Sequence, residues 1–333
     1  MKYLLLFYTG ITISLLCSCS ERDTLPGDND QTRTLLQVVS AGLRPDLRVS
    51  TRDVPPSVVL TSGALGIYLE GQQTDENNNI IAQYGDINNR QYAYNTTVGK
   101  WMPANSGDMI YLFGTDALVC AYYPYHSGVA YADKKALPLQ TQRYTDGEPA
   151  SQAADLYYAL GGIVNGYDPK ITFDLTHAYS MLELRISREN YPQECVLSDI
   201  TVKNVTLAQT GTLNISTDGS VTVTATSNYS FTGMPHTVGS SEVYVCKLLV
   251  VPCELADDPV DATYGISFSL TVDGQVMQIS LPKSELPAFR QGEKYIVGLK
   301  IKGKELNLDT MTAMPWEVSP VGSDKYIPLP ILP

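Results

Sequence analysis

Residues that commonly carry catalysis or bind metals are scarce in this chain. Its three histidines are His126, His177 and His236, and none has metal-ligand spacing to another histidine or to a cysteine. Neither HExxH nor GxSxG occurs. His177, in "FDLTHAYS", is interpreted as a hydrogen-bonded structural residue. Since no nucleophile can be paired with a base, we expect no enzyme, no metal site and no cofactor.

Two stretches imitate ligand-binding loops without meeting their chemical requirements. "GLKIKGKE" has the GxxxxGK spacing of a phosphate loop, but Glu305 replaces the Ser or Thr and the stretch alternates like a strand. "DENNNIIAQYGD" imitates a calcium loop, but Ile80 occupies the turn glycine's position and Asp86 replaces the bidentate glutamate. They are interpreted as a strand and a polar loop.

Size and charge narrow the class of protein. The chain has 333 residues, a net charge of −12 and 44% hydrophobic residues. A length beyond about 250–300 residues favours two domains over one core. Nucleic-acid binding requires a cationic surface. This chain is acidic and has no basic tract, so we do not expect it to bind nucleic acid.

The first residues, "MKYLLLFYTGITISLLCSCS", have the layout of a secretory signal peptide. The apolar run is shorter than the roughly 20 residues that a membrane-spanning helix needs. Leu16-Cys17-Ser18-Cys19 resembles a bacterial lipobox, which implies that residues 1–18 are removed and that Cys19 is acylated. Residues 19–34 would then form a polar leash from the membrane. The alternative is an ordinary signal peptide with incidental cysteines.

Four other cysteines lie along the chain: Cys120, Cys195, Cys246 and Cys253. An exported protein can form disulfides, and four cysteines allow three pairings, among which the sequence does not choose. Free, buried cysteines are an equal alternative.

Alternation of apolar and polar residues with period two dominates the second half of the chain. "LELRIS" directs Leu182, Leu184 and Ile186 to one face and Glu183 and Arg185 to the other. "DITVKNVTL" and "KYIVGLKIKGKELNL" alternate similarly. "LNISTDGSVTVTA" and "ISFSLTVDGQVMQISL" each have Asp-Gly between alternating runs, a strong hairpin signal.

The first half is also rich in strand signals. "ALGIYLEG", "QYAYNTT", "DMIYLFG" and "ALVCAYYPY" predict strands, whereas residues 126–162 look loop-like with a short helix near "ASQAADLYYAL". Many short strands separated by turns favour β-sandwiches. We therefore expect an all-β fold with an N-terminal sandwich over 35–168 and a C-terminal sandwich over 169–333.

Several ordered segments resemble the fimbrillin-like family of Bacteroidales, the lipoprotein subunits of type V pili. They are "STRD", "GIYL", "YAYNTTVGKW", "AYYPY", "DLYYA", "ITFDLTHAYSMLELRI", "GEKYIVGLKI" and "MPWEV". This resemblance implies two tandem transthyretin-like antiparallel sandwiches. It also implies that subunits reach the outer membrane as lipoproteins. An Arg-specific protease removes an N-terminal strand, and a strand from the next subunit fills the opened groove.

The resemblance assigns a processing site near the N-terminus. "LLQVVS" fits the removable strand, placed within 35–52, and Arg52 in "STRD" best matches the family's Thr-Arg position. Arg48 is the second candidate. The alternative is that both are solvated arginines of a linker.

The tail over 317–333 is the candidate donor strand. "SDKYIPLPILP" places Ile327, Leu329 and Ile331 on one face. The intervening prolines cannot donate hydrogen bonds, which favours a polyproline-like chain as the alternative. Stalk, tip and anchor positions in the pilus all remain open.

Two three-residue motifs resemble the O-glycosylation signal of these bacteria, at Thr24 and Thr310. The leading functional hypothesis is a structural or adhesive fimbrial subunit at the cell surface, whose partners are other subunits and, through Cys19, membrane lipid. The alternative is a monomeric surface lipoprotein that binds a host glycan or protein. "AYYPY" is its candidate aromatic platform, with strand-end packing as the competing interpretation.

Overall fold

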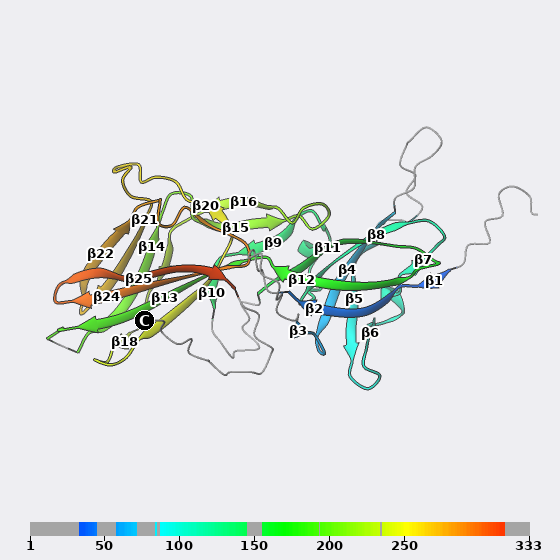
Figure 1. The fold of residues 1–333 in the computed structure, drawn as a ribbon, viewed down its shortest axis with the longest axis horizontal. Helices are drawn as coiled ribbons and strands as arrows, with labels where there is room; N and C mark the ends of the chain where they lie inside the picture. Colours follow the sequence, from blue (N-terminus) through cyan, green and yellow to red (C-terminus); the bar gives the residue numbers. More distant parts are fainter. Residues whose placement is uncertain are drawn as a thin grey trace, which may run out of the picture. The chain divides into compact units, whose positions relative to one another are not determined.

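The alternating segments of the sequence form strands in a computed structural model of the chain (Figure 1). The structure describes residues 33–44, 58–71, 84, 87–144, 155–192, 194–233 and 235–316. Within this part of the chain, regular structure is strand apart from two short 3₁₀ turns, η1 (Ser106–Asp108) and η2 (Val129–Tyr131). The predicted all-β fold is confirmed.

An eight-stranded sheet holds most of the N-terminal strands, in the order β3-β2-β12-β11-β8-β4-β5-β6. Its strands are β2 (Gln37–Leu43), β3 (Val58–Val59), β4 (Ala64–Gly71), β5 (Ile87–Asn95), β6 (Lys100–Pro103), β8 (Ala117–Tyr123), β11 (Tyr157–Val164) and β12 (Lys170–His177). The pair β2–β12 is parallel, and the other pairs are antiparallel. A short separate pair joins β1 (Thr34–Leu35) to β7 (Tyr111–Leu112).

This sheet folds over on itself, because β2 also lies against β6 near the other end of the strand order. The fold encloses an apolar core in which Leu65, Ile67, Val119, Phe173 and Leu175 have at most 1% of their surface exposed. Strand β12 contributes every second side chain to this core: Ile171, Phe173 and Leu175 are buried, and the residues between them are not.

Two sheets of the C-terminal half share a second core. The first has the order β10-β19-β13-β24-β25, and the second β17-β14-β21-β22 with β18 also on β14. The strands are β10 (Gln142–Tyr144), β13 (Ser180–Glu189), β14 (Val196–Lys203), β17 (Tyr229–Phe231), β18 (His236–Thr237), β19 (Tyr244–Val250), β21 (Ile266–Val272), β22 (Gln275–Leu281), β24 (Glu293–Lys302) and β25 (Glu305–Pro315). Buried side chains of both sheets meet between them, as expected for a sandwich.

A third core joins the two halves of the chain. It contains Tyr68 and Tyr122 from the N-terminal sheet together with Leu213 and Leu249 from later strands. A small sheet, β16-β15-β9, borders it, with strands β9 (Leu137–Gln140), β15 (Ala208–Leu213) and β16 (Val221–Thr226). The remaining pair is β20 (Cys253–Glu254) with β23 (Ala288–Phe289).

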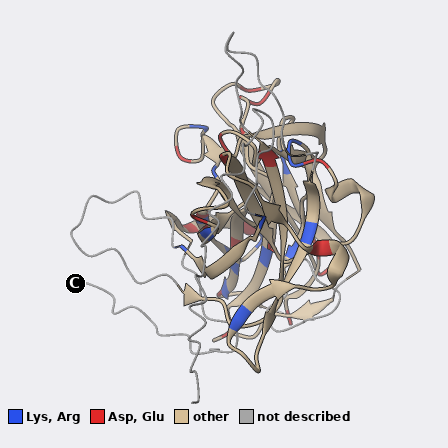
Figure 2. Ribbon diagram, turned by 90° about the vertical axis from the view of Figure 1, so that its right-hand side faces the viewer, with Lys and Arg blue, Asp and Glu red and all other residues tan. Residues whose placement is uncertain are grey.

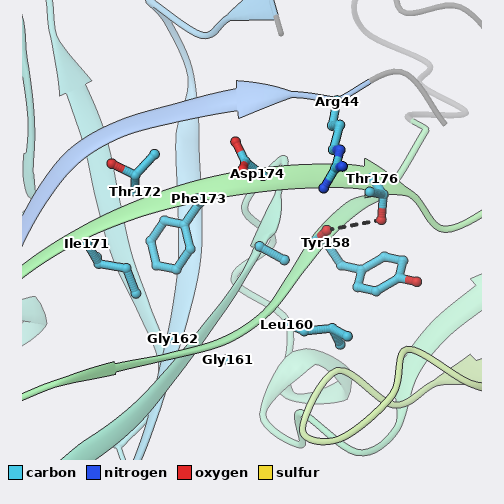
Figure 3. A pocket seen from close by; sticks show the side chains of 11 residues that line it. Arg44, Tyr158, Leu160, Gly161, Gly162, Ile171, Thr172, Phe173, Asp174 and Thr176 are labelled. Atoms are coloured by element: carbon cyan, nitrogen blue, oxygen red, sulfur yellow. Dashed lines mark hydrogen bonds between the residues drawn. The ribbon is translucent and has the colours of Figure 1, made fainter. Parts of the chain in front are cut away.

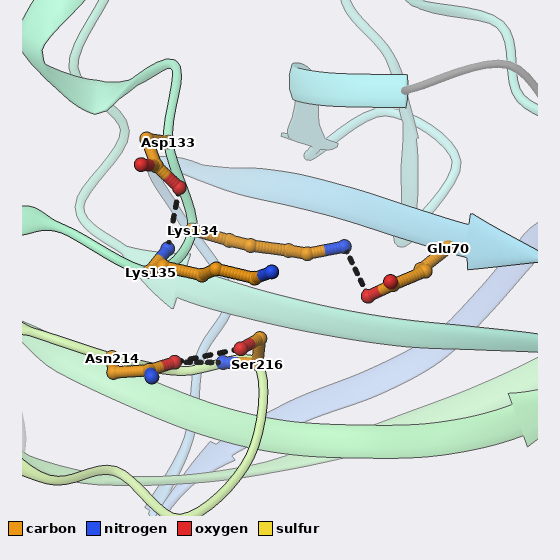
Figure 4. Close-up of polar contacts among 6 residues, drawn as sticks. All are labelled: Glu70, Asp133, Lys134, Lys135, Asn214 and Ser216. Carbon is orange, nitrogen blue, oxygen red and sulfur yellow. Dashed lines mark hydrogen bonds and ion pairs between the residues drawn. The ribbon is translucent and has the colours of Figure 1, made fainter.

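Polar contacts cross the same junction. The Lys134 ammonium lies 2.7 Å from a Glu70 carboxylate oxygen at the end of β4 (Figure 4). The Lys134 carbonyl accepts a 2.9 Å hydrogen bond from the Ile215 amide, just beyond β15. Lys134 therefore ties strands of the two halves together with both its side chain and its backbone.

Strand pairing bears on the predicted division at residues 168 and 169. Strand β12 belongs to the sheet of the N-terminal half, whereas β9 and β10 pair with β15 and β19. If the two halves were divided by the sheets to which β12 and β13 belong, the boundary would lie between His177, the end of β12, and Ser180, the start of β13. The boundaries 35–168 and 169–333 stay a prediction.

The expected loop over residues 126–162 was wrong. Residues 126–162 contain β9, β10 and the start of β11, and the end of "ASQAADLYYAL" is strand; its beginning, residues 151–154, lies outside the described residues. Glu183, which the alternation places on the face opposite to Leu182 and Leu184, is also buried, with only 3% of its surface exposed. Val223 of β16 is 37% exposed.

Both Asp-Gly hairpins are confirmed. Asp273 and Gly274 have φ of +48° and +75° between the antiparallel strands β21 and β22, the backbone that a two-residue hairpin turn requires. Gly219 has φ of +71° between β15 and β16. Tyr295, Val297, Leu299 and Ile301 of β24 are buried, as their alternation predicts.

Candidate functional site

Strand β2, near the N-terminus, is built into the core of the eight-stranded sheet. Val38, Ala41 and Leu43 are at most 4% exposed, and Leu36 just before the strand is 2% exposed. These side chains belong to the same core as Phe173 and Leu175. Full burial of a Val or Leu side chain contributes about 1.5–3 kcal/mol, so β2 is a substantial part of this core.

Backbone hydrogen bonds hold β2 at both ends. The Gln37 amide donates to the Pro169 carbonyl at 2.8 Å, and the Arg44 amide donates to the Leu175 carbonyl at 2.7 Å. On its other edge, β2 pairs with β3 at Gly42 and Leu43 only. Loss of β2 would therefore leave one edge of β12 unpaired along its length.

The ladder between β2 and β12 contains one irregularity. Val38 pairs with Ile171 and Ser40 pairs with Thr172, so Val39 is an extra residue on β2. Val39 is 61% exposed. A bulge of this kind interrupts pairing locally and divides β2 into two shorter paired segments.

A groove of about 540 Å³ lies between β11 and β12, on the other side of β12 from β2 (Figure 3). Ile171 and Phe173 point from β12 toward the β11 strand that carries Gly161 and Gly162, whereas Thr172 and Asp174 point away. Arg44, the residue that follows β2, lines its rim. The groove has no catalytic constellation, since its polar side chains are one cation, one carboxylate and hydroxyls.

His177 forms a buried cluster where β12 ends. Its Nδ1 forms a hydrogen bond with the Asp155 carboxylate, as the interpretation of a hydrogen-bonded residue requires. The Trp316 ring stacks on the imidazole with centroids 3.9 Å apart and planes at 9°, and Tyr157 packs 4.6 Å away. The cluster fastens Trp316, which immediately precedes the tail, to β12.

The Glu183 carboxylate is buried and forms two ion pairs. Its oxygens lie 2.7 Å from Arg185 Nε and 2.5 Å from Lys294 Nζ. Burial would raise the pKa of the Glu183 carboxyl, but the hydrogen bonds from Lys294 and Arg185 outweigh it and hold the pKa below its usual value. Elsewhere Lys and Arg positions are interspersed with Asp and Glu (Figure 2).

The predicted site residues are placed as follows. Seven of them lie outside the described residues: Cys19, Thr24, Arg48, Arg52, Ile327, Leu329 and Ile331. Thr310 is exposed on β25, opposite Gly298 of β24, and the neighbouring Asp309 pairs with Lys300 at 2.6 Å. Tyr122 of "AYYPY" is buried, and its hydroxyl donates hydrogen bonds to Asn89 Oδ1 and to the His126 carbonyl. This arrangement favours packing at the strand end over an exposed aromatic platform.

The four cysteines are free thiols, with Cys120, Cys195 and Cys246 buried and Cys253 partly exposed. Over the described residues, no group of His, Cys, Asp and Glu side chains is arranged to hold a metal ion. Among the same residues, no helix has the length and apolarity to cross a membrane.

The sequence patterns did not predict the groove or the cluster of Trp316 with His177. The Gly161-Gly162 pair was an available signal, because glycines inside a strand mark bulges or close backbone approaches. The register of β11 against β8 does shift between Ala159 and Gly162.

Comparison with solved structures supports the fold. The chain is similar to a candidate cell adhesion protein of Bacteroides uniformis, with 19% identity and a TM-score of 0.55 over 86% of this chain and 100% of that one. A candidate cell adhesion protein of Bacteroides ovatus matches at 15% identity with a TM-score of 0.55, over 86% and 99%. No curated protein sequence matches the chain.

The fimbrillin-like family model matches residues 57–316, which is most of the chain and includes β3, the β11 and β12 residues of the groove, and Trp316. The resemblance found in the sequence is therefore confirmed, and the chain belongs to the fimbrillin-like family.

Proposed function

We propose that this protein is a structural or adhesive subunit of a cell-surface fimbria that assembles by β-strand exchange. The observation that carries the proposal is the position of β2: a core strand near the N-terminus, followed by a segment that contains Arg48 and Arg52. Cleavage after Arg52, or after Arg48, would cut the covalent link between β2 and the rest of the fold.

The energetic consequence of that cleavage follows from the burial of β2. Its departure would expose the apolar surfaces that Leu36, Val38 and Leu43 now cover and would unpair one edge of β12. An unpaired, apolar strand edge binds another strand readily, with backbone hydrogen bonds giving affinity and alternating side chains giving register. The tail of a neighbouring subunit, through Ile327, Leu329 and Ile331, is the proposed donor.

The location follows from the same scheme. The signal over 1–18 would direct export, acylated Cys19 would hold the precursor to the outer membrane, and the leash over 19–34 would leave room for a protease. Two or three acyl chains give a stable anchor, whereas one gives marginal binding. Thr24 and Thr310 are the proposed O-glycosylation sites, and Thr310 is exposed. A host glycan or protein is a partner only for a tip subunit.

The test compares the protein from its native cell surface with variants at the processing site. Arg52→Ala and the double variant Arg48→Ala/Arg52→Ala are expected to keep the N-terminus at Cys19 and to abolish the ladder of polymers on an unboiled denaturing gel. Arg290→Ala, far along the chain, is the matched control and should polymerise normally. A wild-type protein that remains a single species beginning at acylated Cys19 would refute strand exchange and favour a monomeric surface lipoprotein.

A further inference from the structure

An arginine that precedes β2 lies at the very start of the described chain. Arg33 is exposed, and its guanidinium carbon lies 4.0 Å from the centre of the Tyr111 ring, which is the geometry of a cation–π contact. Thr34 is already the first residue of β1, which pairs with β7 (Figure 1). The peptide bond between Arg33 and Thr34 therefore lies where the chain from Cys19 enters the fold.

The pairing that follows this bond is short. β1 pairs with β7 at two positions, and the Leu36 amide just beyond β1 donates a 2.9 Å hydrogen bond to the Ile110 carbonyl. By contrast, β2 pairs with β12 along Lys170–Leu175. Elements with few backbone contacts open at a lower free energy than core strands. β1 can therefore open while β2 stays in place.

Tyr111 holds this bond closed in two ways. Its ring contacts the Arg33 guanidinium, the group that an Arg-specific protease must bind, and its backbone pairs with Leu35 of β1. A protease cleaves exposed, locally unfolded chain, so a bond at the start of a paired strand is cut only after that strand opens. When opening and closing are fast, the cleavage rate follows the population of the open form.

The arginines on the far side of β2 differ from Arg33 in the consequence of cleavage. Arg44 is followed by Pro45, and a bond to proline lacks the N–H and resists trypsin-like proteases. Arg48 and Arg52 lie after β2, so cleavage there separates β2 from the rest of the fold. Cleavage at Arg33 would leave β2 attached.

We propose that the Arg33–Thr34 bond is a second processing site for an Arg-specific protease, kept latent by Tyr111, whose cleavage releases the subunit from its lipid without opening the edge of β12. Hydrolysis consumes one water and leaves a carboxylate on Arg33 and an amino group on Thr34. Residues 19–33 would depart with acylated Cys19, while β1 and β2 stay in the released chain. Because β2 would still cover β12, the released subunit cannot accept a donor strand. The proposal rests on the proposed function for the protease and the lipid anchor.

Limited proteolysis of the full, unprocessed chain with trypsin tests the latency. Every sample carries Arg22→Gln, so that the remaining tryptic site between Cys19 and β1 is Arg33. Mass spectrometry follows the appearance of chains that begin at Thr34. The wild-type bond should be cut at least tenfold more slowly than the same bond in a free peptide of residues 28–38. Cleavage as fast as in that peptide would overturn the proposal.

Variants at the aromatic ring then test the role of Tyr111. Tyr111→Ala should accelerate cleavage at Arg33 about fivefold or more, because the closed form loses the cation–π contact and the packing of the ring. Tyr111→Phe keeps the ring and should be cut at the wild-type rate. Tyr264→Ala is the matched control, a partly exposed tyrosine in the other half of the chain. Equal rates for the two alanine variants would overturn the proposal.

Two further readouts separate a local latch from general loss of structure. If Tyr111→Ala were cut at Arg90 in β5 and Lys170 in β12 as quickly as at Arg33, the whole sheet would be unfolding, and the proposal would be wrong. In the isolated product that begins at Thr34, amide exchange over 170–176 should match that of the uncut chain, since β2 remains. Accelerated exchange there would refute release with β2 in place. None of these results depends on polymerisation, so failure of strand exchange would appear separately, as a missing ladder.

Discussion

The contribution of β2 to the fold can be measured by shortening one of its buried side chains. Leu43 is 2% exposed, pairs with Leu175 of β12 and with Val58 of β3, and belongs to the N-terminal core. Leu43→Ala removes buried carbon atoms and leaves a cavity. Such replacements cost about 2–5 kcal/mol in free energy of unfolding. The position of Leu43 between two partner strands limits relaxation, so we expect a cost of about 3 kcal/mol or more.

Val39 on the same strand provides the matched control. It is the bulged residue, 61% exposed, and its side chain is not part of the core. Val39→Ala should therefore change the free energy of unfolding by no more than about 0.5 kcal/mol. Urea denaturation of both variants in the unprocessed chain, followed by fluorescence and by circular dichroism, measures the difference. Equal costs for the two variants, or a cost below about 1 kcal/mol for Leu43→Ala, would refute the interpretation of β2 as a core strand.

Three further predictions concern other parts of the fold. The pKa of Glu183 is lowered in the folded state, so the unfolded chain binds more protons. The free energy of unfolding should therefore decline as pH falls below the ordinary glutamate pKa of about 4.3. Urea titrations from about pH 6 to 3 should show a weaker decline for Glu183→Gln than for the control Glu285→Gln. Burial raises the pKa of Cys120 to about 12, so maleimide at pH 7 should modify partly exposed Cys253 first and Cys120 only after denaturation, as mapped by mass spectrometry. Gly274→Ala should lower the melting temperature through about 1 kcal/mol of backbone strain, because φ is +75° and no atom lies within 4 Å of the added carbon; no shift in calorimetry would contradict the turn geometry.

Turn residues and apolar alternation predicted the hairpins and strands whose structure depends only on neighbouring residues. The turn at Asp273 and Gly274 requires positive φ at both positions, and the flanking alternation fixes the register of β21 against β22, so one short stretch contained the whole hairpin. Strand β24 was equally accessible because its inner face is apolar without interruption.

Features that depend on distant partners escaped prediction. Strand β9 lies in the stretch that was predicted to be loop-like; it contains Pro138 and is the outer strand of the small sheet, where a missing donor is tolerated. The ion pair of Glu183 was not predicted, because its partner Lys294 lies on β24, far along the chain, and β24 pairs with β13 only in the folded protein. The groove depends on the divergence of β11 from β12, and apolar periodicity carries no information about which strand edges remain unpaired.

The two sides of β12 connect these features into one mechanism. Its β2 edge is occupied along Lys170–Leu175 by a strand that cleavage near Arg52 would detach, and its β11 edge is open over much of the same residues. Phe173 and Leu175 take part in the core that β2 covers, whereas His177 at the end of β12 holds Trp316 at the start of the tail. Displacement of β2 would disturb the backbone of the strand whose end holds Trp316, so we expect processing at the N-terminus to be felt at the start of the tail.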